Sequence, residues 1–292
     1  MGDPRPLLVV NADDYGLTDG VSRGILEGAE RGVITSTSVL TLGPGFADSA
    51  PLLAGTGLGV GAHLAAVGED PPLLSASEIP SLVDARGRLA ASWRQFLPRA
   101  ALGRIDPDDL RREFTAQLEA VRSAGLDVDH LDTHQNLHLW PMVRDVVLDV
   151  GDAADVRVVR VTRSRARGPI GIVVRRLARD LEARLDTRGW RYPTASTGLD
   201  EAGGLDEDAM VTAVTTLGAA VTGTGPGQAA PELASAELAT HPGRPSDADR
   251  QRYRWGYRWD EELDALCSPR VRDAIDAAGF RLGTFADLAA AS

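Results

Sequence analysis

The chain has 292 residues, and its 42 acidic residues outnumber its 31 basic residues to give a net charge of −11. This length allows one large α/β domain or two small ones, and the negative charge argues against nucleic acid or an anionic membrane as the main partner. The single cysteine, Cys267, excludes an internal disulfide and a cysteine-based zinc site, and the absence of lysine excludes chemistry that needs a lysine amine.

Strands and helices are predicted to alternate along the chain. The apolar run from Leu7 to Val10 predicts a buried strand that ends in the turn NADDYG. A helix is predicted to begin at Thr18 or Asp19 and to stop at Gly32, because glycine suits the position after a helix. Further strands are predicted at 33–42, 58–64, 130–138, 156–161 and 236–241, and further helices at 46–54, 106–125, 141–150, 172–185 and 206–220. This order favours a parallel α/β fold.

Four of the predicted strands end in polar side chains. Asp13 and Asp14 follow the first strand, and His63, His134 and His241 each lie at the end of a later one. The stretch HLDTHQNLH alone holds three of the five histidines. Because the carboxyl ends of parallel strands share one face of the fold, we expect these side chains to converge there.

One carboxylate and two imidazoles with open positions for water suit a zinc ion, and a facial arrangement would also suit Fe(II). Asp14, His63 and His134 are therefore the candidate metal ligands. Asp132 precedes His134 by two residues, so it is expected to accept the second N–H of that imidazole. His130 is more typical of a structural residue than of a ligand.

The aromatic residues beside the predicted strand ends have two interpretations. Tyr15 and Trp140 could stack on a sugar ring, although large aromatic side chains near strand ends more often pack in the core. Asn136 and His138 are close enough in sequence to the candidate ligands to contact a substrate. We keep these four residues as candidate substrate contacts, with structural packing as the alternative.

Eleven arginines accumulate between Arg157 and Arg191, several of them on the helix predicted at 172–185. This pattern favours a solvated helix face, with an anion or subunit contact as the alternative. The N-terminal run MGDPRPLLVV is too short to be a signal peptide, and no stretch of 18 apolar residues could span a membrane. We therefore expect a cytoplasmic protein, for which a homodimer is plausible.

Four stretches resemble, in order and spacing, the blocks of the YdjC-like carbohydrate deacetylases: NADDYGLTDGVSRGILEGAERGVITSTSVL, GVGAHL, HLDTHQNLHLWP and ELATHPG. The resemblance covers nearly the whole chain and implies a single domain over residues 1–292, with a distorted, open (β/α) barrel of the glycoside hydrolase and deacetylase kind. It also implies one divalent metal ion, Zn²⁺ above Mg²⁺ or another ion, held by Asp14, His63 and His134. The resemblance also places Asp13 at the position of the family's catalytic base.

The expected reaction is hydrolysis of an N-acetyl group on a carbohydrate or glycoconjugate. An amide is a poor electrophile and its leaving amine must be protonated, for which an imidazole is suited, so His241 is the candidate general acid. The family often has histidines where this chain has Gln135 and Asn136, which leaves the substrate open. The loops at 69–98 and 194–232 are expected to decide it.

Three other functions fit parts of the pattern. A metal-dependent phosphoesterase or amidohydrolase could use a similar barrel, although such enzymes commonly place a His-x-His pair at the first strand end. A non-haem iron oxygenase would use the same ligand types, but its usual scaffold is all-β. An inactive sugar-binding protein could retain the fold, although the presence of Asp13 beside three candidate ligands argues against it.

Overall fold

The computed structural model describes residues 3–223, 234–245 and 247–290. Within these ranges the chain forms a seven-stranded sheet in which every pairing is parallel. The strands are β1 (Leu7–Tyr15), β2 (Ser36–Val39), β3 (Gly59–Leu64), β4 (His130–Thr133), β5 (Ala195–Thr197), β6 (Ser235–Thr240) and β7 (Arg281–Leu282). Because the strands are parallel, their carboxyl ends lie at one edge, which is where the sequence predicted that the polar side chains converge.

The sheet curls into a barrel that is closed only loosely. Its strand order is β4-β3-β2-β1-β6-β5, with β7 added beside β1. Among the described residues no strand pairing joins β4 to β5; isolated bridges link Leu131 of β4 to Val159, and Val158 to Arg191. The expected distorted, open α/β barrel is therefore confirmed, but the strand predicted at 156–161 is reduced to these isolated bridges.

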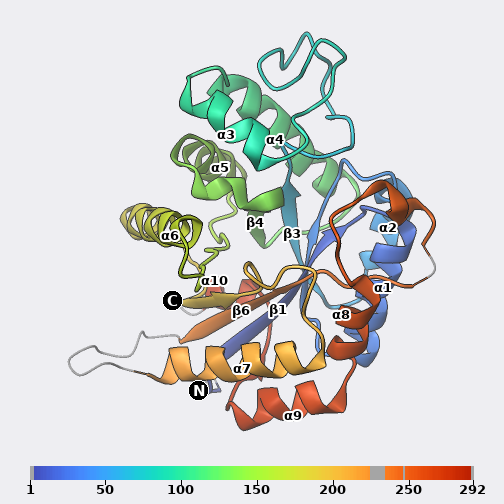
Figure 1. Ribbon diagram of the computed structural model, residues 1–292, viewed down its shortest axis with the longest axis vertical. Helices are drawn as coiled ribbons and strands as arrows, with labels where there is room; N and C mark the ends of the chain where they lie inside the picture. The colour runs from blue at the N-terminus through green and yellow to red at the C-terminus, as the bar shows by residue number, and fades with distance from the viewer. Residues whose placement is uncertain (1–2, 224–233, 246, 291–292) are drawn as a thin grey trace.

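Helices surround the central strands (Figure 1). They are α1 (Asp19–Arg31), α2 (Phe46–Ser49), α3 (Trp93–Ala101), α4 (Pro107–Ser123), α5 (Pro141–Ala154), α6 (Pro169–Arg188), α7 (Glu207–Thr222), α8 (Trp259–Leu266), α9 (Pro269–Ala277) and α10 (Ala286–Ala290). Three 3₁₀ helices join them, η1 (Ala50–Leu53), η2 (His134–Leu139) and η3 (Asp249–Arg252). None of the described helices combines the length and apolar composition that a bilayer span requires.

Local capping explains why the best-predicted helices begin where they do. The Thr18 hydroxyl accepts a hydrogen bond from the backbone N–H of Val21 and so caps α1. Asp106 caps α4 in the same way, and Pro107 occupies the first helical position, where a missing N–H costs nothing. Apolar residues then recur on the buried face of α4, namely Leu110, Phe114, Leu118 and Val121.

Along one face of β1 the side chains change from apolar at the amino end to polar at the carboxyl end. Leu7 and Val9 are buried in a small apolar cluster with Val158 and Phe285. Asn11 and Asp13 share their parity and therefore their face of the strand, but Asp13 lies at the carboxyl end and lines a pocket. The apolar cluster thus fills the amino end of the barrel, and the polar pocket lies at the carboxyl end.

The stretch at 130–138 is only partly strand, which corrects the prediction. β4 ends at Thr133, and η2 follows, with Gln135 and Asn136 in the left-handed region at φ of 55° and 54°. Such φ values interrupt a strand ladder and are uncommon for residues other than glycine. His134 is therefore the first residue of η2 and not part of the strand. Of the predicted loop at 194–232, residues 224–232 lie outside the described residues.

Candidate active site

A β-bulge brings two neighbouring carboxylates into one pocket. In the pairing of β1 with β2, Ala12 faces Thr37 and Tyr15 faces Val39, so three steps on one strand match two on the other. Asp14 provides the extra residue, with a φ of 69°. Adjacent residues of a regular strand point to opposite faces, and the bulge removes this alternation. Asp13 and Asp14 both line a pocket of about 320 Å³ at the carboxyl end of the barrel.

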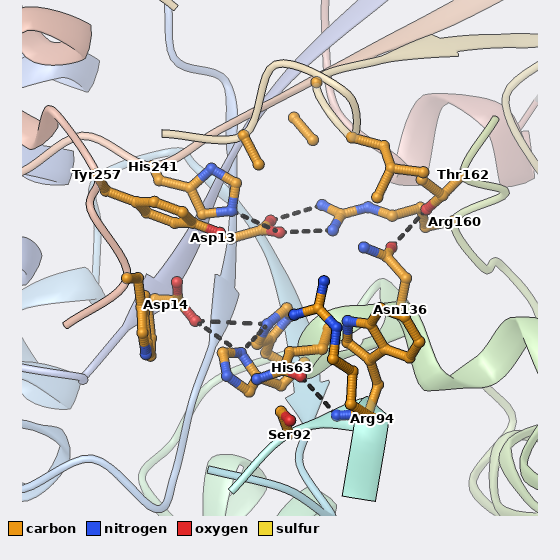
Figure 2. Close-up of a pocket in the computed structure, with 18 residues that line it drawn as sticks. Asp13, Asp14, His63, Ser92, Arg94, Asn136, Arg160, Thr162, His241 and Tyr257 are labelled. Carbon is orange, nitrogen blue, oxygen red and sulfur yellow. Dashed lines mark hydrogen bonds and ion pairs between the residues drawn. The ribbon is translucent and has the colours of Figure 1, made fainter. Parts of the chain in front are cut away.

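Asp14, His63 and His134 line this pocket and bring their ligand atoms together, and Figure 2 shows Asp14 beside His63. Asp14 Oδ1 lies 3.5 Å from His63 Nε2 and 3.3 Å from His134 Nδ1. The two imidazole nitrogens are 3.3 Å apart. The three side chains come from the ends of β1, β3 and β4, so the parallel topology brings together residues that are distant in sequence.

The spacing of these three atoms fits a bound cation. Two ligands held at about 2.0–2.1 Å by a tetrahedral zinc ion lie about 3.3 Å apart. Asp14 Oδ1 is buried and accepts no hydrogen bond of normal geometry from a described residue. Burial opposes ionisation of Asp14, but the facing imidazoles of His134 and His63 outweigh it and lower its pKa to about 2. These residues could therefore hold a metal ion.

Asp132 supports His63 rather than His134, which corrects the expected pairing. Its Oδ1 lies 2.7 Å from His63 Nδ1, so that nitrogen donates to the carboxylate, and Nε2 lies 3.5 Å from Asp14 Oδ1. Burial by itself would lower the pKa of His63, but the Asp132 carboxylate outweighs it and raises that pKa to about 9. A carboxylate in this position fixes the tautomer of a ligating imidazole. The register of β3 and β4 explains the pairing, because His63 lies directly opposite Asp132.

Arg160 lines the pocket and was not singled out by the sequence. Its side chain is 2% exposed, and its guanidinium makes two hydrogen bonds of 2.6 Å to the Asp13 carboxylate. It also lies 3.0 Å from Asp132 Oδ2 and 2.6 Å from Glu237 Oε1. Asp13, His63 and Asp132 form a second cluster of metal-ligand types, but Arg160 already occupies its carboxylates. The three-residue site around Asp14 is therefore the better cation site.

We expect Arg160→Met to destabilise the protein by about 3–5 kcal/mol, because it leaves buried carboxylates without their cation. Chemical denaturation of the two proteins measures this difference. Arg157→Met is the matched control, since Arg157 belongs to the same arginine-rich stretch but its side chain is 57% exposed and pairs with Asp152 at 3.4 Å. The control should cost no more than about 1 kcal/mol. Equal stability of the Arg160 variant and the wild type would contradict the role of Arg160.

His241 lies across the pocket from the cation site, beside Asp13 (Figure 2). Its Nε2 is 3.8 Å from Asp13 Oδ2, and its backbone N–H donates to Glu262 Oε2 at 2.6 Å. The other ring nitrogen, Nδ1, has no hydrogen-bond partner among the described residues. The imidazole therefore reaches the pocket from the end of β6, with its backbone held by the first turn of α8.

The aromatic segment at 253–259, after β6, contributes Trp255 and Tyr257 to the pocket lining. Trp255 packs on the His134 ring with centroids 5.2 Å apart, and Tyr257 meets the His241 ring at 4.9 Å. The signal for this segment was present in the sequence, because aromatic residues recur at every second position in YRWGYRW. Such alternation directs the rings to one side of an extended chain.

The four candidate substrate contacts are not equivalent. Asn136 lines the pocket, and its Oδ1 accepts a 2.5 Å hydrogen bond from Thr162. Tyr15 is buried outside the pocket lining, because its ring turns into the core and its hydroxyl donates to the Ser49 carbonyl. His138 is also buried, 2.8 Å from the Thr133 hydroxyl, and burial lowers its pKa to about 4. Trp140 lines a neighbouring apolar cavity instead.

The fold and the site together define an α/β-barrel protein with a candidate mononuclear metal centre. The family model of the YdjC-like proteins matches residues 7–277, and the chain belongs to this family. A protein named carbohydrate deacetylase from Brevibacillus brevis is 33% identical over 152 residues, which cover 52% of this chain and 58% of that protein. Another of that name from Enterococcus faecalis is 36% identical over 135 residues, which cover 45% and 49% of the two chains.

The chain thus spans about half the length of the curated relatives that it matches. A solved structure matches much more of it. The crystal structure of an Enterococcus faecalis protein named for cellobiose-phosphate cleavage superposes with a TM-score of 0.79, covering 97% of this chain and 99% of that one. At 23% sequence identity, this likeness shows the fold alone.

Proposed function

We propose that this protein is a metal-dependent carbohydrate deacetylase, which hydrolyses an N-acetyl group to release acetate and a free amine. The observation that carries the proposal is the group of three ligand atoms from Asp14, His63 and His134 within 3.5 Å of one another. Asp13 and His241 face the same pocket as a candidate base and acid. The names of the curated relatives support a carbohydrate as the substrate class.

Zinc is the ion that best suits these ligands, because two imidazoles and one carboxylate are typical of it, whereas Mg²⁺ prefers oxygen ligands. A divalent cation bound there supplies polarisation of the amide carbonyl and activation of water towards deprotonation. With its Nδ1 held by Asp132, His63 would offer Nε2 as the ligand atom for such an ion.

Asp13 is proposed to accept the proton of the attacking water. Arg160 holds this carboxylate through two hydrogen bonds, which fixes its position in the pocket. His241 is proposed to donate a proton to the departing amine, since its imidazole lies beside Asp13 at the same pocket wall. Asp13 and His241, the proposed base and acid, lie beside each other in the pocket (Figure 2).

Trp255 and Tyr257 are proposed to form the platform for the sugar ring. Both line the pocket, Trp255 next to the candidate ligand His134 and Tyr257 next to the candidate acid His241. An aromatic face packs well against the C–H groups of a pyranose while the ring hydroxyls meet the polar wall formed by Asn136 and its neighbours.

Incubation of the zinc-loaded protein with a panel of N-acetylated sugars, followed by an assay for acetate, tests this function. We expect equimolar acetate and free amine from at least one sugar, and no product after the metal is removed with a chelator. Release of phosphate from a sugar phosphate, with no acetate from any N-acetylated compound, would instead support the phosphoesterase alternative.

A further inference from the structure

A second cavity, of about 620 Å³, lies beside the candidate active site. The two cavities share Trp93, Gln135, Asn136 and Leu199 in their linings, so they adjoin each other. The first contains the candidate ligands, the base and the acid, whereas the second is lined mainly by apolar side chains. We call this second cavity the apolar groove; its apolar residues include Trp93, Leu97, Leu137, Leu139, Trp140, Ile170, Val173, Val174, Leu177 and Leu199.

One wall of the apolar groove is a helix face that remains exposed to solvent. Ile170, Val173, Val174 and Leu177 recur at helical spacing on α6 and line the groove. Ile170 is 61% exposed and Val173 is 54% exposed. In Figure 1, α6 stands at the periphery of the barrel beside α5. Large apolar side chains gathered in a concave surface of this kind mark a binding site more often than a free surface.

The wall between the two cavities is held in place by hydrogen bonds. Gln135 Oε1 accepts a 2.8 Å hydrogen bond from the backbone N–H of Trp93, and Asn136 Oδ1 accepts one from Thr162. Both residues have left-handed backbone angles, and such strain concentrates at functional sites. Gln135 and Asn136 therefore set the shape of the boundary between the polar pocket and the groove.

We propose that the substrate carries a hydrocarbon chain, alkyl or acyl, that occupies the apolar groove while its N-acetylated sugar occupies the polar pocket. This inference rests on the proposed function and specifies its substrate class. The hydroxyl groups of a second sugar would lose hydration against the apolar lining without gaining partners, whereas a hydrocarbon chain gains free energy from the same contact. The groove volume lies within the range of small-molecule sites, roughly 300–1,000 Å³.

The structure also provides a matched control. Ile172 lies on the same turn of α6 and is 58% exposed, close to the 54% of Val173, but it is absent from the groove lining. Polar substitution at either position removes a similar exposed apolar side chain. Only the change at Val173 alters the groove.

The experiment compares methyl, butyl and octyl glycosides of N-acetylglucosamine, each below its micelle-forming concentration, with the zinc-loaded protein. Each methylene that enters the groove contributes up to about fourfold to kcat/KM for acetate release, so we expect the octyl glycoside to exceed the methyl glycoside by more than tenfold. Val173→Asn should lower this octyl-to-methyl ratio several-fold, and Ile172→Asn should leave it unchanged. Equal kcat/KM for all chain lengths would overturn the inference.

Calorimetric binding of the same glycosides separates this inference from the proposed function. Failure of every glycoside to release acetate would contradict the function, but tighter binding of octyl than methyl glycoside, weakened by Val173→Asn, would still support the groove. Equal binding of the two glycosides would overturn it. The competing occupant of the groove is a second copy of this chain, and sedimentation tests for it. If Val173→Asn dissociates a dimer while kcat/KM and binding do not depend on the length of the glycoside chain, the groove is a dimer interface and the inference is overturned.

Discussion

Asp13→Asn should lower kcat for acetate release by about 10²- to 10⁴-fold, the range that general bases contribute, while the bound metal remains stoichiometric. The amide keeps the size of the side chain but cannot accept a proton from water. Steady-state kinetics and elemental analysis of the same purified sample measure both quantities. Because Asp13 also pairs with Arg160, the variant must first be shown to be folded by circular dichroism.

Asp129→Asn is a suitable control for this prediction. Asp129 is a largely buried carboxylate that pairs with His130 at 2.6 Å, but it is absent from the pocket lining. Its replacement should leave kcat within about twofold of the wild type. A wild-type rate for Asp13→Asn would remove Asp13 from the role of base, and loss of its metal would mean that it acts through the cation site instead.

His134→Ala should abolish stoichiometric metal binding, because only Asp14 and His63 would remain as ligands. Loss of a residue that merely supports a ligand commonly weakens metal affinity by about 10- to 100-fold, so loss of a ligand should weaken it by more than about 100-fold. Elemental analysis after dialysis, together with competition against a chelator of known affinity, measures this change. Acetate release should fall in parallel and recover in part at high zinc concentration.

The control for the metal prediction is His138→Ala. His138 is a buried histidine in the same segment, but it contacts Thr133 and lines neither cavity. Its replacement should lower the free energy of unfolding through the cavity that it creates, yet leave the metal content of the folded protein unchanged. Unaltered metal stoichiometry in His134→Ala would exclude His134 from the ligand set.

Local patterns were enough to predict most of the regular structure. The capped starts of α1 and α4 depend on residues within a few positions of each other, Thr18 with Val21 and Asp106 with Pro107, so the sequence contains all the information that they need. Strand lengths were less predictable. β1 extends through Tyr15 and β4 stops at Thr133, because pairing with neighbouring strands and backbone strain, rather than local composition, set these limits.

Part of the candidate site followed from the same reasoning. Parallel strands place their carboxyl ends at one edge, and this rule alone predicted that Asp14, His63 and His134 would gather. The pairing of Asp132 with His63 did not follow, because it depends on the register of β3 against β4. The inward direction of both Asp13 and Asp14 depends on a bulge that no local pattern indicates.

The sequence by itself determined the order of helices and strands, the residue types at the strand ends and the excess of negative charge, because these depend on near neighbours or on composition. Only the tertiary structure decided which of eleven arginines is buried as the counterion of Asp13, and which apolar residues of α6 face the groove. Whether a side chain is buried, and with which residue it pairs, depends on segments that are far apart in the chain. Arg160 and Asp13 are separated by 147 positions, and no pattern within either segment distinguishes this arginine from its exposed neighbours.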